Sequence, residues 1–145
     1  MHMESGELHV GEAYHIDVIA AAFGTSFGWF IKGIIPRRDT HGMPYVLLFS
    51  SVVNPASSSL SGRTLRFCGE GSAGGPEPTG ATRALLRACS GHAPIFGFRK
   101  ERRGRVWRYL GPLHVISCTQ ELCEERLQFV FVFECLSGPE EREKS

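Results

Sequence analysis

An apolar run from Tyr45 to Val53 lies between two prolines, Pro44 and Pro55. Proline has no backbone N–H and restricts the residue before it to extended conformations, so a helix through this region is disfavoured. The run is rich in β-branched and aromatic residues, which favours a strand buried on both faces. We therefore predict a buried strand that the chain leaves at Asn54-Pro55.

Other segments carry helical or alternating patterns. Apolar residues at helical spacing before Gly24 predict a short helix over residues 15–23. A second helix is predicted to end at Gly91, with Thr79 or Thr82 as its N-cap and a buried stripe formed by Ala81, Leu85, Ala88 and Cys89. Further strands are predicted over residues 64–67, 95–99, 105–110, 113–118 and 127–136.

The order of these elements predicts an α+β domain. Its centre would be a curved, mostly antiparallel sheet or a partly closed β-barrel, with two or more short helices. The aromatic pattern of residues 127–136 places that strand centrally in the sheet. We expect a single domain over residues 8–136, with flexible termini at 1–7 and 137–145.

Composition narrows the class of protein. The chain has 145 residues, 42% of them hydrophobic and 21% charged, which suits one globular domain with a substantial core. Its sequence has no apolar run of membrane-spanning length and no pattern of a signal peptide, so we expect a cytoplasmic protein with no membrane partner. Five scattered cysteines suggest reduced, buried thiols, and we expect neither a metal site nor a cofactor.

A net charge of +1 conceals an uneven distribution of charged residues. Between Arg99 and Arg108 there are six basic residues and one acidic residue, Glu101, on a predicted hairpin whose tip is Arg102-Arg103-Gly104. Because Trp107 and Tyr109 alternate with the basic residues, the hairpin is a signal for nucleic-acid binding. Charged hairpin tips also protect sheet edges, so a purely structural role is an alternative.

The loop Gly24-Thr25-Ser26-Phe27-Gly28-Trp29-Phe30 places three aromatic residues beside glycines. It is followed by Lys32, Arg37 and Arg38, as in the rim of a ligand site, although the aromatic side chains could instead fold against the sheet. His41 lies in a predicted turn and could touch a ligand. We find no local pairing of a nucleophile with a base that would indicate an enzyme.

Several short motifs are spread over roughly residues 8 to 135. They are Val10-Gly11-Glu12-Ala13-Tyr14, Ala22-Phe23-Gly24, Val46-Leu47-Leu48-Phe49, Asn54-Pro55, Gly69-Glu70-Gly71, Thr82-Arg83-Ala84-Leu85, Pro94-Ile95-Phe96-Gly97-Phe98 and Trp107-Arg108-Tyr109-Leu110-Gly111. In these motifs the chain resembles one family, the sulfur-binding domains of McrA-like type IV restriction endonucleases and related stand-alone bacterial modules. These domains read phosphorothioate-modified DNA.

The resemblance implies an apolar pocket that receives the phosphorothioate sulfur. Pro55 and Ala56 would form its floor and Asn54 would bond a base edge, while an ordinary phosphate oxygen would lose water there without gaining donors. Arg83 would meet a backbone phosphate. The remaining DNA-facing residues would be Ser26, Gly28, Trp29, Phe30, Lys32, Arg37, Arg38 and His41.

The leading hypothesis is therefore a non-enzymatic module that binds double-stranded DNA carrying a phosphorothioate linkage. The chain lacks the HNH nuclease domain of the larger enzymes, so it would act alone or with a separately encoded nuclease or effector. The main alternative is a modified-base or RNA reader of SRA or PUA type, in which Trp29 and Phe30 form an aromatic cage. A small enzyme or a protein-interaction domain is a third interpretation.

Overall fold

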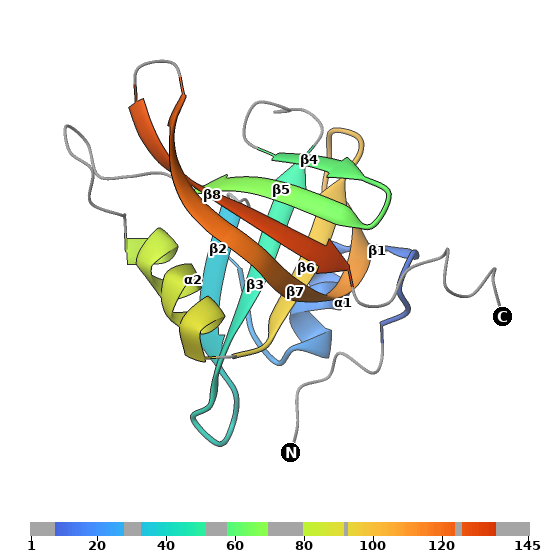
Figure 1. Cartoon of the computed structure of the whole chain (residues 1–145). Coiled ribbons are helices and arrows are strands. Elements are labelled where there is room, and N and C mark those ends of the chain that lie inside the picture. The colour runs from blue at the N-terminus through green and yellow to red at the C-terminus, as the bar shows by residue number, and fades with distance from the viewer. Residues whose placement is uncertain are drawn as a thin grey trace, which may run out of the picture.

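The computed structural model describes residues 8–27, 33–51, 58–69, 80–91, 93–123 and 126–135 (Figure 1). These residues form a curved sheet with two short helices, as the sequence predicted. The elements in chain order are β1 Ala13–His15, α1 Ile16–Ala22, β2 Gly33–Arg38, β3 Pro44–Ser51, β4 Ser58–Ser61, β5 Thr64–Gly69, α2 Gly80–Gly91, β6 Ile95–Lys100, β7 Val106–Cys123 and β8 Arg126–Cys135.

The strands follow the order β2-β3-β6-β7-β8-β5-β4, and β1 pairs with β7 beside this path. All pairs are antiparallel except β3 with β6, which run parallel with Val46 opposite Ile95 and Ser51 opposite Lys100. Strands β2 and β4 end the order, so the described sheet is open. Strand β8 lies between β7 and β5, which confirms its predicted central position.

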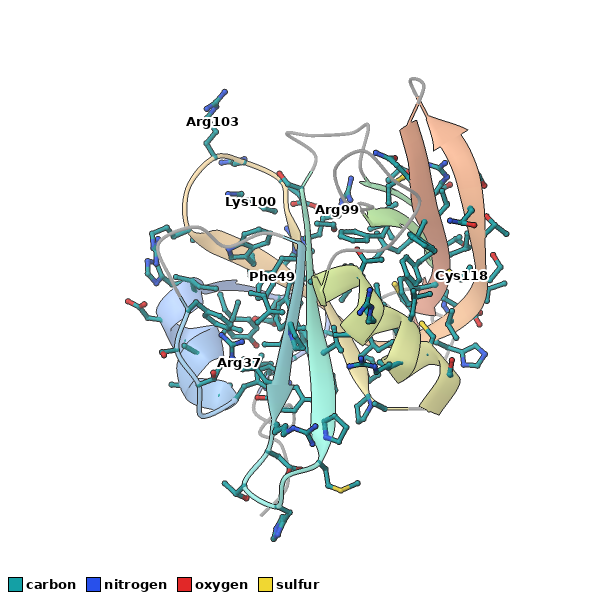
Figure 2. The ribbon with its side chains drawn as sticks, turned by 90° about the vertical axis from the view of Figure 1, so that its left-hand side faces the viewer. Arg37, Phe49, Arg99, Lys100, Arg103 and Cys118 are labelled. Carbon is teal, nitrogen blue, oxygen red and sulfur yellow. The ribbon has the colours of Figure 1, made fainter. Side chains whose placement is uncertain are left out.

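Two hydrophobic clusters lie on opposite faces of the β3–β6 pair, because successive side chains of a strand point to opposite faces. Tyr45, Leu47 and Phe49 of β3 join Phe98 and Trp107 in a cluster covered by α1. Val46 and Leu48 of β3 and Ile95 of β6 point to the other face. There they pack against α2 and against the half of the sheet formed by β5, β8 and the second part of β7. The helices α1 and α2 accordingly lie on either side of β2 and β3 (Figure 2).

Strand β7 is a single long strand where the sequence predicted two, over 105–110 and 113–118. Its first part pairs with β1 and β6 and its second part with β8, so one strand belongs to both halves of the sheet. Gly111 has a φ of 89°, a conformation that glycine adopts without strain, and the chain can therefore change direction there without ending the strand.

Gly97 on β6 is required by close packing. A Cβ at this position would lie 2.9 Å from Cδ1 of Leu113, and Leu113 is buried in the core. A side chain here would displace a packed leucine. The glycine therefore lets β6 approach β7 at the point where the register of this pair shifts, between Gly97 and Phe98.

The predicted helix over 15–23 is confirmed as α1, and the side chain of His15 caps it by accepting a hydrogen bond from the backbone N–H of Asp17 at 3.1 Å. The strand predicted over 45–53 is confirmed within the described residues as β3. Thr82 is wrong as an N-cap, because it lies inside α2 and is buried. Residues 52–53 and Thr79 are outside the described residues.

Strands β1, β2 and β4 were not predicted, because they are short or their apolar pattern is interrupted. Strand β2 contains Pro36, and proline is tolerated because β2 is an edge strand. The prediction of buried cysteines holds for Cys68 and Cys135, whereas Cys118 is exposed. In the described part of the chain, neither helix has the length and apolar character needed to cross a membrane.

Candidate nucleic-acid interface

One end of the sheet collects several residues that flank the predicted site. Gly33, the first residue of β2, pairs with Phe49, and Ser51, the last residue of β3, pairs with Lys100. We call the end formed by Gly33, Ser51 and Lys100 the Lys100 end. Gly28, Trp29, Phe30 and Lys32 immediately precede it along the chain, and Asn54, Pro55 and Ala56 closely follow Ser51; all seven lie outside the described residues.

Arg38 and His41 lie at the other end of the β2–β3 hairpin. Arg38 pairs with Pro44 and donates a hydrogen bond to the carbonyl of Gly42 at 2.7 Å. Because a strand rises about 3.3 Å per residue, Arg38 is roughly 16 Å from Gly33. The structure thus separates Arg38 and His41 from the Lys100 end.

Asp39 holds the turn between these two strands. Its carboxylate oxygen Oδ1 accepts hydrogen bonds from the backbone N–H groups of His41 at 2.8 Å and Met43 at 2.9 Å. The hydrogen bond from Met43 is the main cause that lowers the pKa of Asp39 below its usual value. His41 thus lies in the turn that the sequence predicted, and the carboxylate of Asp39 holds that turn in place.

Arg37 is engaged with the predicted aromatic loop. Its Nε donates to Oγ1 of Thr25 at 2.9 Å, and its Nη2 donates to the carbonyl oxygen of Ser26 at 3.1 Å. The guanidinium carbon also lies 6.0 Å from the centre of the Phe27 ring, within cation–π range. Arg37 therefore fixes the segment that leads toward the Lys100 end, and Ser26 itself is exposed.

Phe27 folds against the sheet, which is the second of the two arrangements that the sequence left open for the aromatic loop, and it is not part of an open rim. Its ring meets that of Phe49 edge to face, with 5.6 Å between ring centres, and it packs against the cluster under α1. Trp107 and Tyr109, which alternate with the basic residues of the hairpin, are each 2% exposed, so their rings belong to the core and not to an exposed nucleic-acid surface. Strand alternation explains this outcome, since these two residues point to the face opposite Arg108.

Arg83 is exposed in the first turn of α2. Further along this helix, Arg87 lines a cavity of about 440 Å³ between α2 and the β2–β3 hairpin, and Arg37 and Arg38 line the same cavity. Two of the predicted site residues thus meet here with a third arginine. Arg83 does not line this cavity.

The basic hairpin between β6 and β7 contains functional candidates that the predicted site residues omitted. Arg99, Arg102, Arg103 and Arg108 line a cavity of about 410 Å³ together with Glu101, Ala13 and Val106. Arg99, Lys100 and Arg103 lie toward the same end of the molecule, away from Arg37 (Figure 2). The run of basic residues indicated this surface in the sequence. The sequence could not show, however, that Arg99 is buried while the other basic residues of the run are more exposed.

Charge within this cavity is only partly balanced. Nη2 of Arg108 lies 3.0 Å from Oε1 of Glu101, and this hydrogen-bonded ion pair lowers the pKa of Glu101. Arg108 also donates to the carbonyl oxygen of Gly11. The described residues contain no group of three or more His, Cys, Asp or Glu side chains that would hold a metal ion. Four arginines against one glutamate leave the lining positively charged, which suits the cavity to anions.

Solved structures of SRA (SET and RING associated) domains share this architecture. The SUVH5 SRA domain in complex with fully methylated CG DNA superimposes with a TM-score of 0.63 at 20% sequence identity, and 90% of each chain is covered. The chain has the fold of an SRA domain. The SUVH5 SRA domain bound to fully hydroxymethylated CG DNA gives a TM-score of 0.64 at 19% identity, covering 90% of this chain and 91% of that one.

A third similar structure is the DNA modification-dependent restriction endonuclease AspBHI. Its TM-score is 0.53 at 20% identity, and the match covers 69% of this chain but 33% of the endonuclease. The similarity therefore concerns about a third of that larger enzyme. No protein-family model and no curated protein matches the sequence.

Proposed function

We propose that this chain is a non-enzymatic SRA-type module that binds double-stranded DNA and reads a modified base. The observation that carries the proposal is the similarity, over 90% of both chains, to SRA domains solved with methylated and with hydroxymethylated CG DNA. A base inside a duplex can be read in full only when it leaves the stack, so the module would flip the modified base.

The topology supports a site at the Lys100 end. Gly33 follows the predicted aromatic loop, and Ser51 precedes Asn54-Pro55-Ala56. The pairing of β2, β3 and β6 places Gly33 and Ser51 at the same end of the sheet. In this proposal Trp29 and Phe30 supply the aromatic surfaces for the flipped base, since stacking on an aromatic side chain replaces the stacking lost in the duplex. Arg83 and Lys32 would contact phosphates.

Phosphorothioate recognition is the second candidate. It is favoured by the motifs centred on Asn54-Pro55, and the similarity to a modification-dependent restriction endonuclease fits a reader of either modification. The two candidates differ in the residue that matters most, because the sulfur pocket depends on Pro55 and the aromatic cage on Trp29.

Fluorescence anisotropy with four matched duplexes tests the proposal. One duplex is unmodified, and the others carry one 5-methylcytosine, one 5-hydroxymethylcytosine or one phosphorothioate. We expect a modified-base duplex to bind at least about tenfold more tightly than the unmodified one, which is the discrimination that about 1.4 kcal/mol provides. Preference for the phosphorothioate alone would instead support the second candidate.

Three variants locate the site within this assay. Trp29→Ala should abolish the preference for the modified base while Trp29→Phe retains most of it, and Pro55→Ala should have little effect. A 2-aminopurine placed beside the modified base should brighten on binding if the base leaves the stack. Equal affinity of the wild-type protein for all four duplexes would refute modification reading.

A further inference from the structure

Arg99 is a buried guanidinium with few partners. It is 9% exposed, and among the described residues its side chain has one hydrogen-bond partner, Oγ of Ser50, at the long distance of 3.5 Å. The hydroxyl of Ser50 is itself 3.2 Å from the carbonyl oxygen of Phe98, to which it donates. A guanidinium has five N–H donors, so most of the donors of Arg99 are unused within the described structure.

Desolvation of this group is unfavourable. Burial lowers the pKa of Arg99, and the negative charge of Glu101 opposes that shift only in part. Glu101 is already paired with Arg108 at 3.0 Å, so it cannot serve as the full counterion of Arg99. Buried charges in folded proteins are normally paired, which indicates that an anion completes the site.

The surroundings of Arg99 specify the kind of anion. The cavity it lines holds about 410 Å³, and its lining contains four arginines and one glutamate, a net charge of +3. Arg99 lies opposite Arg108 on β7 and opposite Ser50 on β3, one residue before the Lys100 end. A phosphate group has several acceptor oxygens and a compact charge, which matches converging guanidinium groups.

We infer that the cavity between Arg99 and Arg103 holds a backbone phosphate of the bound DNA, with Arg99 as its deepest contact. This inference rests on the proposed DNA-binding function but not on which modification is read. A phosphate held here would fix the duplex beside the Lys100 end, where the modified base is proposed to bind. The contact would raise the affinity for every duplex and would carry no sequence information.

Anisotropy titrations from about 50 to 200 mM salt on the unmodified duplex test the inference. Arg99→Met keeps an unbranched side chain that resembles the aliphatic stem of arginine, and it removes the charge. We expect the affinity at the low-salt end to fall about tenfold, and the slope of log K against log salt to become shallower by about one. The affinity for the modified duplex should fall by the same factor. Wild-type affinity and slope in this variant would overturn the inference.

Thermal unfolding separates a lost contact from a damaged fold. Because Arg99→Met removes a poorly paired buried charge, we expect its melting temperature to stay the same or rise. A second variant, Arg102→Ala with Arg103→Ala, changes two exposed side chains of the same cavity and should also weaken binding and lower the slope. If Arg99→Met fails to fold, this double variant decides: an unchanged affinity and slope would overturn the inference.

Arg66→Ala is the matched control. Arg66 is about 40% exposed on β5 and paired with Glu121, in the second half of the sheet. Its loss removes the same charge, yet should leave the salt slope unchanged. An equal loss of slope in this control would overturn the inference in favour of a general charge effect.

Inorganic phosphate distinguishes the source of the anion. A site for free phosphate would give a rise in melting temperature at millimolar phosphate in the wild type only, with no change of DNA affinity in the variants, and that result would overturn the inference. Failure of the proposed function has a different signature. In that case the wild type binds modified and unmodified duplexes equally, while the Arg99 variant still weakens both.

Discussion

Arg99 and Arg108 occupy paired positions on neighbouring strands, yet their surroundings differ. Arg108 has the carboxylate of Glu101 and the carbonyl oxygen of Gly11 as partners, whereas Arg99 reaches a single distant hydroxyl among the residues that the structure describes. The sequence presents both as members of one basic run. A charge run identifies a surface, but burial and pairing decide which of its residues has donors left for a ligand.

Asp39 provides a pH test at the same scale. Its pKa is lowered from 3.8 chiefly by the hydrogen bond from the Met43 N–H. A lowered folded-state pKa means that the carboxylate stabilises the fold above about pH 4 and that this contribution is lost as the pH falls through the folded value. We expect the melting temperature of the wild type to exceed that of Asp39→Ala at pH 6, and the gap to close toward pH 3.

Two comparisons make the Asp39 result interpretable. Asp39→Asn keeps an acceptor oxygen and should lose less stability than Asp39→Ala, with little dependence on pH. Glu12→Gln, which changes an exposed carboxylate in another loop, should follow the wild-type profile. A gap between wild type and Asp39→Ala that stays constant from pH 6 to 3 would contradict the role assigned to the charged form.

At the scale of elements, the loop after α1 is fixed to β2 by one side chain. Arg37 bonds Thr25 and Ser26 and lies near Phe27, while Phe27 packs on Phe49. Sequence reasoning selected Arg37 as a DNA contact because it is basic and near the aromatic loop. In the structure Arg37 instead makes these contacts within the protein. They depend on its position in the edge strand β2, which the sequence pattern did not predict.

Arg37→Ala should therefore loosen the segment before Gly28. We expect a loss of about 1–3 kcal/mol in unfolding free energy, because hydrogen bonds to a charged donor are removed from a partly buried site. Amide hydrogen exchange should accelerate at residues 25–27 and remain slow in β7. Arg38→Ala, which removes a bond to the β2–β3 turn, is the control, and faster exchange at residues 25–27 in that variant would argue against a specific clamp.

The strands that were predicted are those whose apolar or alternating pattern runs over most of their length. Strand β3 is bracketed by prolines and β8 alternates aromatic residues, so both were predicted. Strands β1 and β4 are short, and β2 is interrupted by Pro36. None of the three therefore has a run of alternating or apolar residues long enough to predict a strand. The pairing of β3 with β6 could not be predicted either, because it depends on contacts between segments far apart in the chain.

At the scale of the molecule, β7 joins two clusters of core residues. Trp107 and Tyr109 belong to the cluster under α1, and Leu110 and Leu113 belong to the one that contains Phe131 and Phe133. Because the same strand crosses both, neither cluster can lose its packing while β7 stays fully paired. The described fold should therefore unfold as one cooperative unit.

Phe133→Ala tests this cooperativity. Phe133 is fully buried, and we expect its truncation to cost about 3–5 kcal/mol. Trp107 fluorescence, measured in a Trp29→Phe background, should report the same lowered urea midpoint as far-UV circular dichroism. Ile116→Ala, which truncates a side chain that is 56% exposed on β7, should change the midpoint little. Separate midpoints for the two signals would contradict a single unit.

The parallel pairing of β3 with β6 has a consequence for dissection of the molecule. Ser51 and Lys100 are neighbours in space, but the chain between them includes β4, β5 and α2. A synthetic peptide that spans either strand alone would lack the partner that orients its last residue. The proposed recognition surface is therefore a property of non-local pairing. Attempts to shorten the protein should retain every element from β1 to β8, and transplanting single loops onto another scaffold should not transfer binding.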